Sequence, residues 1–185
     1  MTVRPIVLIG LGNSLLGDEG IGVSLVQALS AEFAHHSDVE CIDLGIAGMA
    51  LLHILDGRRK VVLLDCALMG EQPGACRRFT PKDVRDISTS SRCSLHDGNL
   101  LDLLALAGEI GGLPPEVVIF GIQPESINAS LTLSPTLQHK FDEYMTKVRN
   151  EVRRTMVSTA AANDDLSCEG SDNPMNRNDV TAQPC

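Results

Sequence analysis

The sequence predicts an α/β protein with three layers, α/β/α, built around a mainly parallel twisted sheet of about five strands. From residue 4 to about residue 155, short runs of aliphatic and β-branched residues alternate with runs of helical periodicity, which is typical of β-α-β units. The run Lys60–Leu64 is apolar on both faces, as expected of a central strand that helices cover on each side.

The first part of this pattern places strands at Arg4–Ile9 and Val39–Leu44, followed by the central strand, which we expect to end at Asp65. Between the first two strands a helix begins near Gly20, and a shorter helix follows the second strand over Gly48–Leu55. Apolar residues recur in the first helix at helical spacings and bury one face: Ile21, Val23, Leu25, Val26, Leu29 and Phe33.

The second part adds two strands and a long helix. Gly74–Phe79 alternates and carries charge, which indicates an edge strand whose direction the pattern does not assign. Glu116–Ile122 is a further buried strand. Ser134 is placed to cap a final helix that runs to about Arg154, with Pro135 in its first turn, where a missing N–H costs nothing.

Another helix is predicted from about Leu95 to Ala107. Ser94 would be its N-cap, and Asp97, three residues later, completes an arrangement like a capping box. This assignment puts His96 in the first turn, where the positive end of the helix dipole disfavours the imidazolium ion. The neutral imidazole ring is the form that binds a metal ion.

Composition limits the partners that this chain can have. Its net charge of −9 disfavours nucleic acid and anionic membranes, and a single tyrosine without tryptophan leaves no platform for stacking bases. No apolar run approaches the roughly 20 residues of a membrane span. The six cysteines form no C-x-x-C pair, so we expect reduced thiols in a cytoplasmic protein. We expect one domain over residues 1–155 and a disordered acidic tail over 156–185.

A glycine-rich loop follows the first strand and carries two adjacent acids, Asp18 and Glu19. These carboxylates occupy the place near a helix N-terminus where a phosphate group would bind, so the loop favours a cation. Acids just before a helix also complement the helix dipole, and that structural interpretation stays open for this pair.

Three candidate metal ligands lie where the chain faces one edge of the predicted sheet: Glu19, Asp65 and His96. Two oxygens and one nitrogen suit Ni²⁺, Zn²⁺ or Co²⁺ better than Ca²⁺ or Mg²⁺, and three protein ligands leave positions for water or a partner. Taken singly, Asp65 also fits a loop hydrogen bond and His96 a surface position. A carboxylate bound to a metal ion is a poor base, so the general base is unassigned. Asp43 ends the second strand at the same edge and is a candidate for orienting a substrate.

Further motifs accompany the pattern Gly10-x-Gly12-Asn13-x-x-x-x-Asp18-Glu19-Gly20-x-Gly22; they are Asp43-x-Gly45-x-Ala47-Gly48, Leu64-Asp65, Leu95-His96 and Gly121-Ile122-Gln123-Pro124-Glu125. Together they resemble the hydrogenase maturation endopeptidases, which trim the large subunit of nickel-iron hydrogenases, over residues 4 to about 150. The resemblance implies that Glu19, Asp65 and His96 bind the metal and that Asp43 takes part in substrate recognition.

The resemblance also implies a three-layer fold and removal of a short C-terminal extension from the large-subunit precursor after nickel insertion. The nickel belongs to the substrate, and another divalent cation can occupy the site in vitro. Ile46 stands where the family usually has threonine or serine, a departure that bears on substrate selection. Two alternatives stay open. One is a non-catalytic nickel checkpoint or chaperone for the same precursor, and the other is a dinucleotide-binding domain, which would need glycine where Leu15 stands.

Overall fold

A computed structural model describes residues 4–83, 94–95 and 99–165. Its sheet has four parallel strands, β1 (Ile6–Leu11), β2 (Val39–Gly45), β3 (Lys60–Leu68) and β6 (Glu116–Ile122). β4 (Cys76–Phe79) runs antiparallel to β6, and the strand order is β2-β1-β3-β6-β4. The short strand β5 (Ser94–Leu95) pairs only with β3 among the described strands. The predicted, mainly parallel sheet is therefore confirmed, and β4 is the predicted edge strand.

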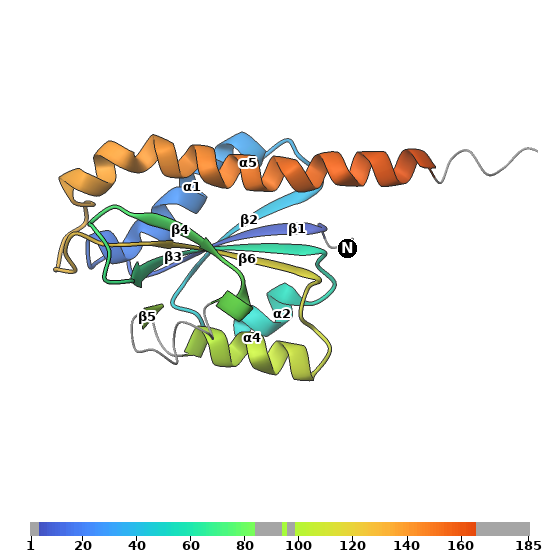
Figure 1. Ribbon diagram of the computed structural model, residues 1–185, viewed down its shortest axis with the longest axis horizontal. Helices are drawn as coiled ribbons and strands as arrows, with labels where there is room; N and C mark the ends of the chain where they lie inside the picture. Colours follow the sequence, from blue (N-terminus) through green and yellow to red (C-terminus); the bar gives the residue numbers. More distant parts are fainter. Residues whose placement is uncertain (1–3, 84–93, 96–98, 166–185) are drawn as a thin grey trace, which may run out of the picture. The chain divides into compact units, whose positions relative to one another are not determined.

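Helices lie on both faces of this sheet (Figure 1). α1 (Ile21–Phe33) and the part of α5 (Pro135–Asp165) before Arg153 cover one face, and α2 (Ala50–Leu55) and α4 (Asn99–Glu109) cover the other. Residues up to Val152 form one compact unit, and the chain from Arg153 onward belongs to a second. In the described ranges no helix combines the length and the apolar character that crossing a bilayer requires.

The central strands are buried because helices cover both of their faces. Every residue of β1 is buried, as are the first eight of β3. Val61 and Leu63 of β3 belong to the core cluster on the face of α2 and α4, together with Leu51 and Leu104. Burying each aliphatic side chain of this kind contributes about 1.5–3 kcal/mol to the stability of the unit.

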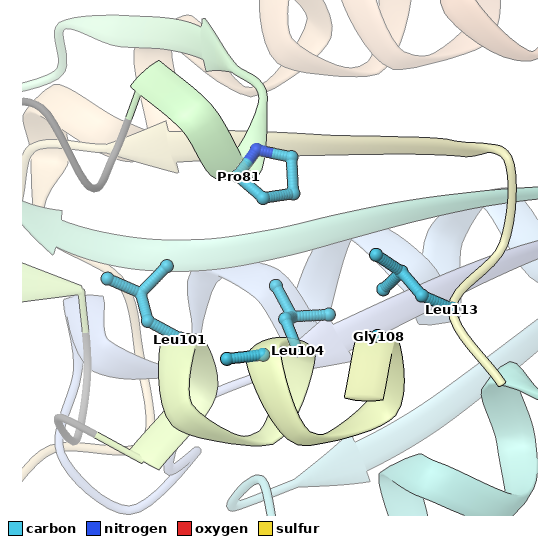
Figure 2. A pocket seen from close by; sticks show the side chains of 6 residues that line it. Pro81, Leu101, Leu104, Gly108 and Leu113 are labelled. Carbon is cyan, nitrogen blue, oxygen red and sulfur yellow. The ribbon is translucent and has the colours of Figure 1, made fainter. Parts of the chain in front are cut away.

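α4 leaves a shallow apolar hollow of about 180 Å³ on the outside of this core (Figure 2). Leu101 and Leu104 extend from α4 toward Pro81, which follows β4, and Leu113 lines one end. The described residues that line it are aliphatic residues and glycine, and none of them carries a group for acid–base or metal chemistry.

The prediction that the central strand ends at Asp65 is wrong. β3 continues to Leu68, and Asp65 lies within it. The extra length comes from pairing with distant segments, since Cys66 pairs with Ile122 of β6 and Ala67 pairs with Leu95 of β5. A strand that is extended by such partners has no local boundary for the sequence pattern to detect.

The helix predicted from Leu95 to Ala107 begins later than expected. Ser94 and Leu95 form β5, and α4 begins at Asn99, so Ser94 is not its N-cap. Because α4 begins only at Asn99, its dipole gives no reason to expect a neutral imidazole at position 96. At the other end of the chain α5 continues to Asp165, beyond the predicted end near Arg154. Residues 166–185 of the predicted tail lie outside the described residues.

The predicted start of α5 is confirmed. Pro135 is its first residue, and the backbone N–H of Leu137 donates a hydrogen bond of 3.4 Å to the Ser134 hydroxyl oxygen. This is the N-cap arrangement, in which a side-chain oxygen accepts from one of the free N–H groups in the first turn.

Candidate functional site

The sheet order creates a switch point between β1 and β3. After β1 the chain crosses to β2 on one side, and after β2 it returns to form β3 on the other side of β1. Connections that leave two adjacent parallel strands in opposite directions open a crevice at the carboxyl ends of those strands, where α/β proteins bind ligands. Glu19 follows β1 and Asp65 lies near the end of β3, so both candidates belong to this crevice.

Glycines let the loop after β1 approach the backbone of β3. A side chain at Gly22 would collide with the carbonyl oxygen of Leu64, and one at Gly12 would collide with that of Glu19. Gly12 also has a φ of 121°, a conformation that favours glycine. The start of α1 is therefore pressed against β3 next to Asp65, and the turn Asp18–Gly20 (η1) contacts this strand.

Both predicted carboxylate ligands are buried. Glu19 is 4% exposed and Asp65 is 0% exposed. Both residues have polar or electrostatic interactions with the rest of the protein. The Oδ1 atom of Asp65 makes no hydrogen bond within the described part of the chain. Carboxylates are rarely this deeply buried unless charge or hydrogen bonding compensates for the lost water, and such positions are frequent in functional sites.

The thiol of Cys66 reports the negative character of this region. Burial is the main reason that the pKa of the Cys66 thiol rises to about 12. The carboxylates of Asp65, Glu19 and Asp18 raise the pKa further, in that order, because a thiolate would add negative charge beside them. All three carboxylates therefore act on the Cys66 thiol, which stays neutral at physiological pH.

Asp18 has a different role from its neighbour Glu19. One of its oxygens, Oδ2, accepts hydrogen bonds from the backbone N–H groups of Glu125 at 2.9 Å and Ser126 at 3.2 Å. The other, Oδ1, accepts from the N–H of Ser134 at 2.7 Å. Asp18 thus holds the loop between β6 and α5, which lines a hollow of about 360 Å³ with Gly17. Its carboxylate is therefore committed to the backbone through both of its oxygens.

Sequence reasoning missed a second side chain that, like Asp18, fixes a loop at this edge by accepting backbone hydrogen bonds; we call both side chains clamps. The side-chain oxygen of Gln123, directly after β6, accepts hydrogen bonds from the N–H groups of Met69 at 2.7 Å and Glu71 at 3.3 Å. Gln123 is 8% exposed. The only sequence signal for this role was a polar residue directly after a buried strand. In the structure, Gln123 holds the loop after β3.

Asp43 lies at the same edge of the sheet as Asp65 but on the opposite face. It is exposed and accepts a hydrogen bond of 2.9 Å from the amide of Gln27 on α1. Gly10 pairs with both Asp43 and Leu64, so these three residues share the face of α1. Asp65, one position after Leu64, points to the opposite face. The structure therefore does not bring the carboxylates of Asp43 and Asp65 side by side.

His96 lies outside the described residues. The described backbone brings Leu95 opposite Ala67, two positions beyond Asp65 in β3. Among the residues that the structure describes, no group of three histidine, cysteine or acidic side chains is arranged to hold a metal ion. The described region contains two of the three predicted ligands, so the full ligand set stays a prediction.

The fold agrees with comparisons to known proteins. A family model described as hydrogenase maturation protease matches residues 23–151. The chain belongs to this family. The hydrogenase 2 maturation protease of Escherichia coli K12 is 30% identical over 153 residues, which are 82% of this chain and 93% of that protein. The family named from the sequence motifs, and the peptidase class of that family, are confirmed.

The chain spans only part of the length of some curated relatives. HoxM of Azotobacter vinelandii, a hydrogenase expression/formation protein, is 32% identical over 69% of this chain, but the match spans only 61% of HoxM. The E. coli maturating endopeptidase HybD has the same fold, with a TM-score of 0.68 and 27% identity over 81% of this chain and 93% of HybD. A hydrogenase 2 maturation peptidase from a Thaumarchaeota archaeon gives 0.60 and 31%, over 80% and 97% of the two chains.

Proposed function

We propose that this chain is an endopeptidase that removes the C-terminal extension of a nickel-loaded NiFe hydrogenase large-subunit precursor. The observation that carries the proposal is the burial of Glu19 and Asp65 at the switch point of a maturation-protease fold. Relatives that are named hydrogenase maturation proteases support the substrate class.

The proposed role of Glu19 and Asp65 is to recognise the nickel that the substrate carries. A divalent cation bound by these carboxylates would offset the cost of burying them. We propose His96 as the third ligand, since the chain that enters it pairs with β3 just beyond Asp65. Two oxygens and one imidazole nitrogen suit a borderline first-row ion, and the precursor would supply the other ligands.

We assign Asp43 to substrate recognition rather than to the metal. Its carboxylate is exposed on the face of α1 and is held by Gln27. From this position it can contact a peptide that leaves the crevice along the edge strand β2. Ile46, exposed three residues later, would then meet the same part of the substrate.

The proposal is tested with a nickel-loaded large-subunit precursor and intact-mass measurement. We expect the wild-type chain to shorten the precursor, a nickel-free precursor to stay uncut, and Glu19→Gln to stop cleavage. Glu109→Gln makes the same chemical change at an exposed position at the end of α4 and should cut at the wild-type rate.

Two outcomes would contradict the proposal. Cleavage by Glu19→Gln at the normal rate would remove Glu19 from the site. A stable complex of the wild-type chain with precursor that never loses mass would instead favour a non-catalytic checkpoint protein. Circular dichroism of each variant separates loss of the site from loss of the fold.

A further inference from the structure

Large apolar side chains are exposed mainly at the edge of the sheet that carries the candidate site. Among the described residues, those exposed by at least a third fall into two groups. Six lie at the ends of β1, β2, β3 and β6 or in the loops that follow them, and we call this set the apolar rim: Leu15, Ile46, Met49, Leu68, Ile127 and Leu131. The other two, Ile110 and Leu113, lie between α4 and β6 at the opposite edge.

This distribution places the apolar rim around the crevice. Single exposed apolar residues are normal on protein surfaces, but a group on neighbouring loops marks an interaction site. Because these four strands are parallel, the loops after them meet at one edge, which lies at the left of Figure 1. The apolar rim therefore lies at the same edge of the sheet as Glu19 and Asp65.

One side of the apolar rim is built as a rigid platform. The N–H of Ser130 donates to the carbonyl oxygen of Leu15 at 3.0 Å, and the N–H of Gly17 donates to that of Ser130 at 2.9 Å. These bonds join the loop after β1 to the loop after β6, and Asp18 fixes the second loop through its backbone. Leu15 and Leu131 are 64% and 81% exposed although their backbone is held in place. A preorganised apolar surface binds without a large ordering cost.

The charge of the loops that carry most of the apolar rim determines which kind of partner surface can bind there. The segments 12–17, 46–49 and 123–134 contain no lysine or arginine. Their one exposed acid is Glu125, whose pKa is lowered by hydrogen bonds from Thr136 and Ser134, so it is ionised at neutral pH. The nearby Arg77 of β4 forms an ion pair with Glu71. An acidic surface would therefore be repelled, whereas an apolar surface without acids fits.

We propose that the apolar rim docks an apolar, non-acidic surface of the folded precursor, beside the peptide that enters the crevice. This inference rests on the proposed function and adds the surface that holds the substrate. A second copy of the chain fits less well, because a symmetric contact would bring two Glu125 carboxylates toward each other without a cation from these loops. The rim is also continuous with the crevice, so a docked precursor would exclude water from Glu19 and Asp65.

The proposal is tested with Leu131→Ser and Leu15→Ser, compared with Ile110→Ser. Ile110 is a matched control, because it is 64% exposed, like Leu15, but lies at the opposite edge. Titration calorimetry measures binding of an uncut large-subunit precursor to each variant in a Glu19→Gln background, and steady-state kinetics measures cleavage without that substitution. Removing one buried leucine contact should weaken binding and raise KM roughly tenfold, with kcat unchanged. The control should bind and cut as the wild type does.

The outcomes separate the two proposals. Binding that is weakened by the rim variants, without any cleavage by the wild-type chain, would support the docking surface and overturn the peptidase proposal. Cleavage with an unchanged KM in both rim variants would overturn the docking surface and leave the peptidase proposal intact. Light scattering tests whether a second copy of the chain occupies the rim instead. If the wild type is a dimer that Leu131→Ser dissociates, and the variant binds the precursor normally, docking of the precursor is overturned.

Discussion

The carboxylate of Asp18 accepts a 2.7 Å hydrogen bond from the backbone N–H of Ser134, 116 residues away in the chain. This bond joins the turn before α1 to the residue that caps α5. Since the next residue, Glu19, is a candidate metal ligand, Asp18 also determines where that ligand lies. One acid of the adjacent pair therefore holds the loops together, while its neighbour is the candidate ligand.

Asp18→Asn should destabilise the protein by about 2–3 kcal/mol, because an amide offers one oxygen where a carboxylate offers two, and its NH₂ group would face an N–H donor. Denaturant unfolding of both proteins at neutral pH measures the difference. Asp142→Asn changes an exposed acid of α5 and should stay within about 0.5 kcal/mol of the wild type. Equal stability of the two variants would show that Asp18 is not a clamp.

Gly22→Ala should lower both stability and activity. The new methyl group would meet the carbonyl oxygen of Leu64, so α1 must move away from β3 and carry Glu19 away from Asp65. Forced repacking of this kind costs about 1–3 kcal/mol. Gly108→Ala in α4 is the control, because its methyl group meets only Leu113, at 3.8 Å, and the helix gains up to about 1 kcal/mol. Urea unfolding and precursor cleavage test both, and a fully active Gly22→Ala protein would exclude the close-approach argument.

Glu151 should make stability depend on pH at the amino-terminal edge of the sheet. Burial alone would raise the pKa of its carboxyl, but hydrogen bonds from Arg78 and Lys60 lower it to about 2. Lys60 is 1% exposed and donates to Glu151 at 2.7 Å. A depressed pKa in the folded state stabilises the protein above the unfolded value of 4.5, and this contribution disappears as pH falls toward 2.

Glu151→Gln should therefore cost about 1.5–3 kcal/mol at pH 7, the range for hydrogen bonds to charged groups, and progressively less below pH 4.5. Urea unfolding of both proteins at several pH values between 7 and 2.5 measures the difference. The exposed pair Glu143 and Lys147, four residues apart on α5, provides the control, because Glu143→Gln should cost less than about 0.5 kcal/mol at any of these values. A Glu151→Gln deficit that does not change with pH would contradict the assignment.

Much of the fold was predictable because its signals are local. The alternation of apolar runs determined the parallel sheet, and the apolar run at Lys60–Leu64 identified its centre. Ser134 and Pro135 marked the start of α5 to the residue, since an N-cap and a first-turn proline act on their own helix. The predicted element ends at Asp65 and Ser94 were wrong because pairing between distant strands decided them. Asp65 lies within β3 and Ser94 within β5, and these two strands pair with each other.

The sequence by itself determined that two acids follow a strand at a glycine-rich loop and that a third acid lies at the same edge of the sheet. The family followed from the same residues. Only the tertiary structure decided that Asp18 bonds to the backbone, that Asp43 faces α1, and that exposed apolar side chains gather at the same edge of the sheet. The physical reason is that a carboxylate has no role until its partners are in place, and the three N–H groups that engage Asp18 come from residues more than 100 positions away.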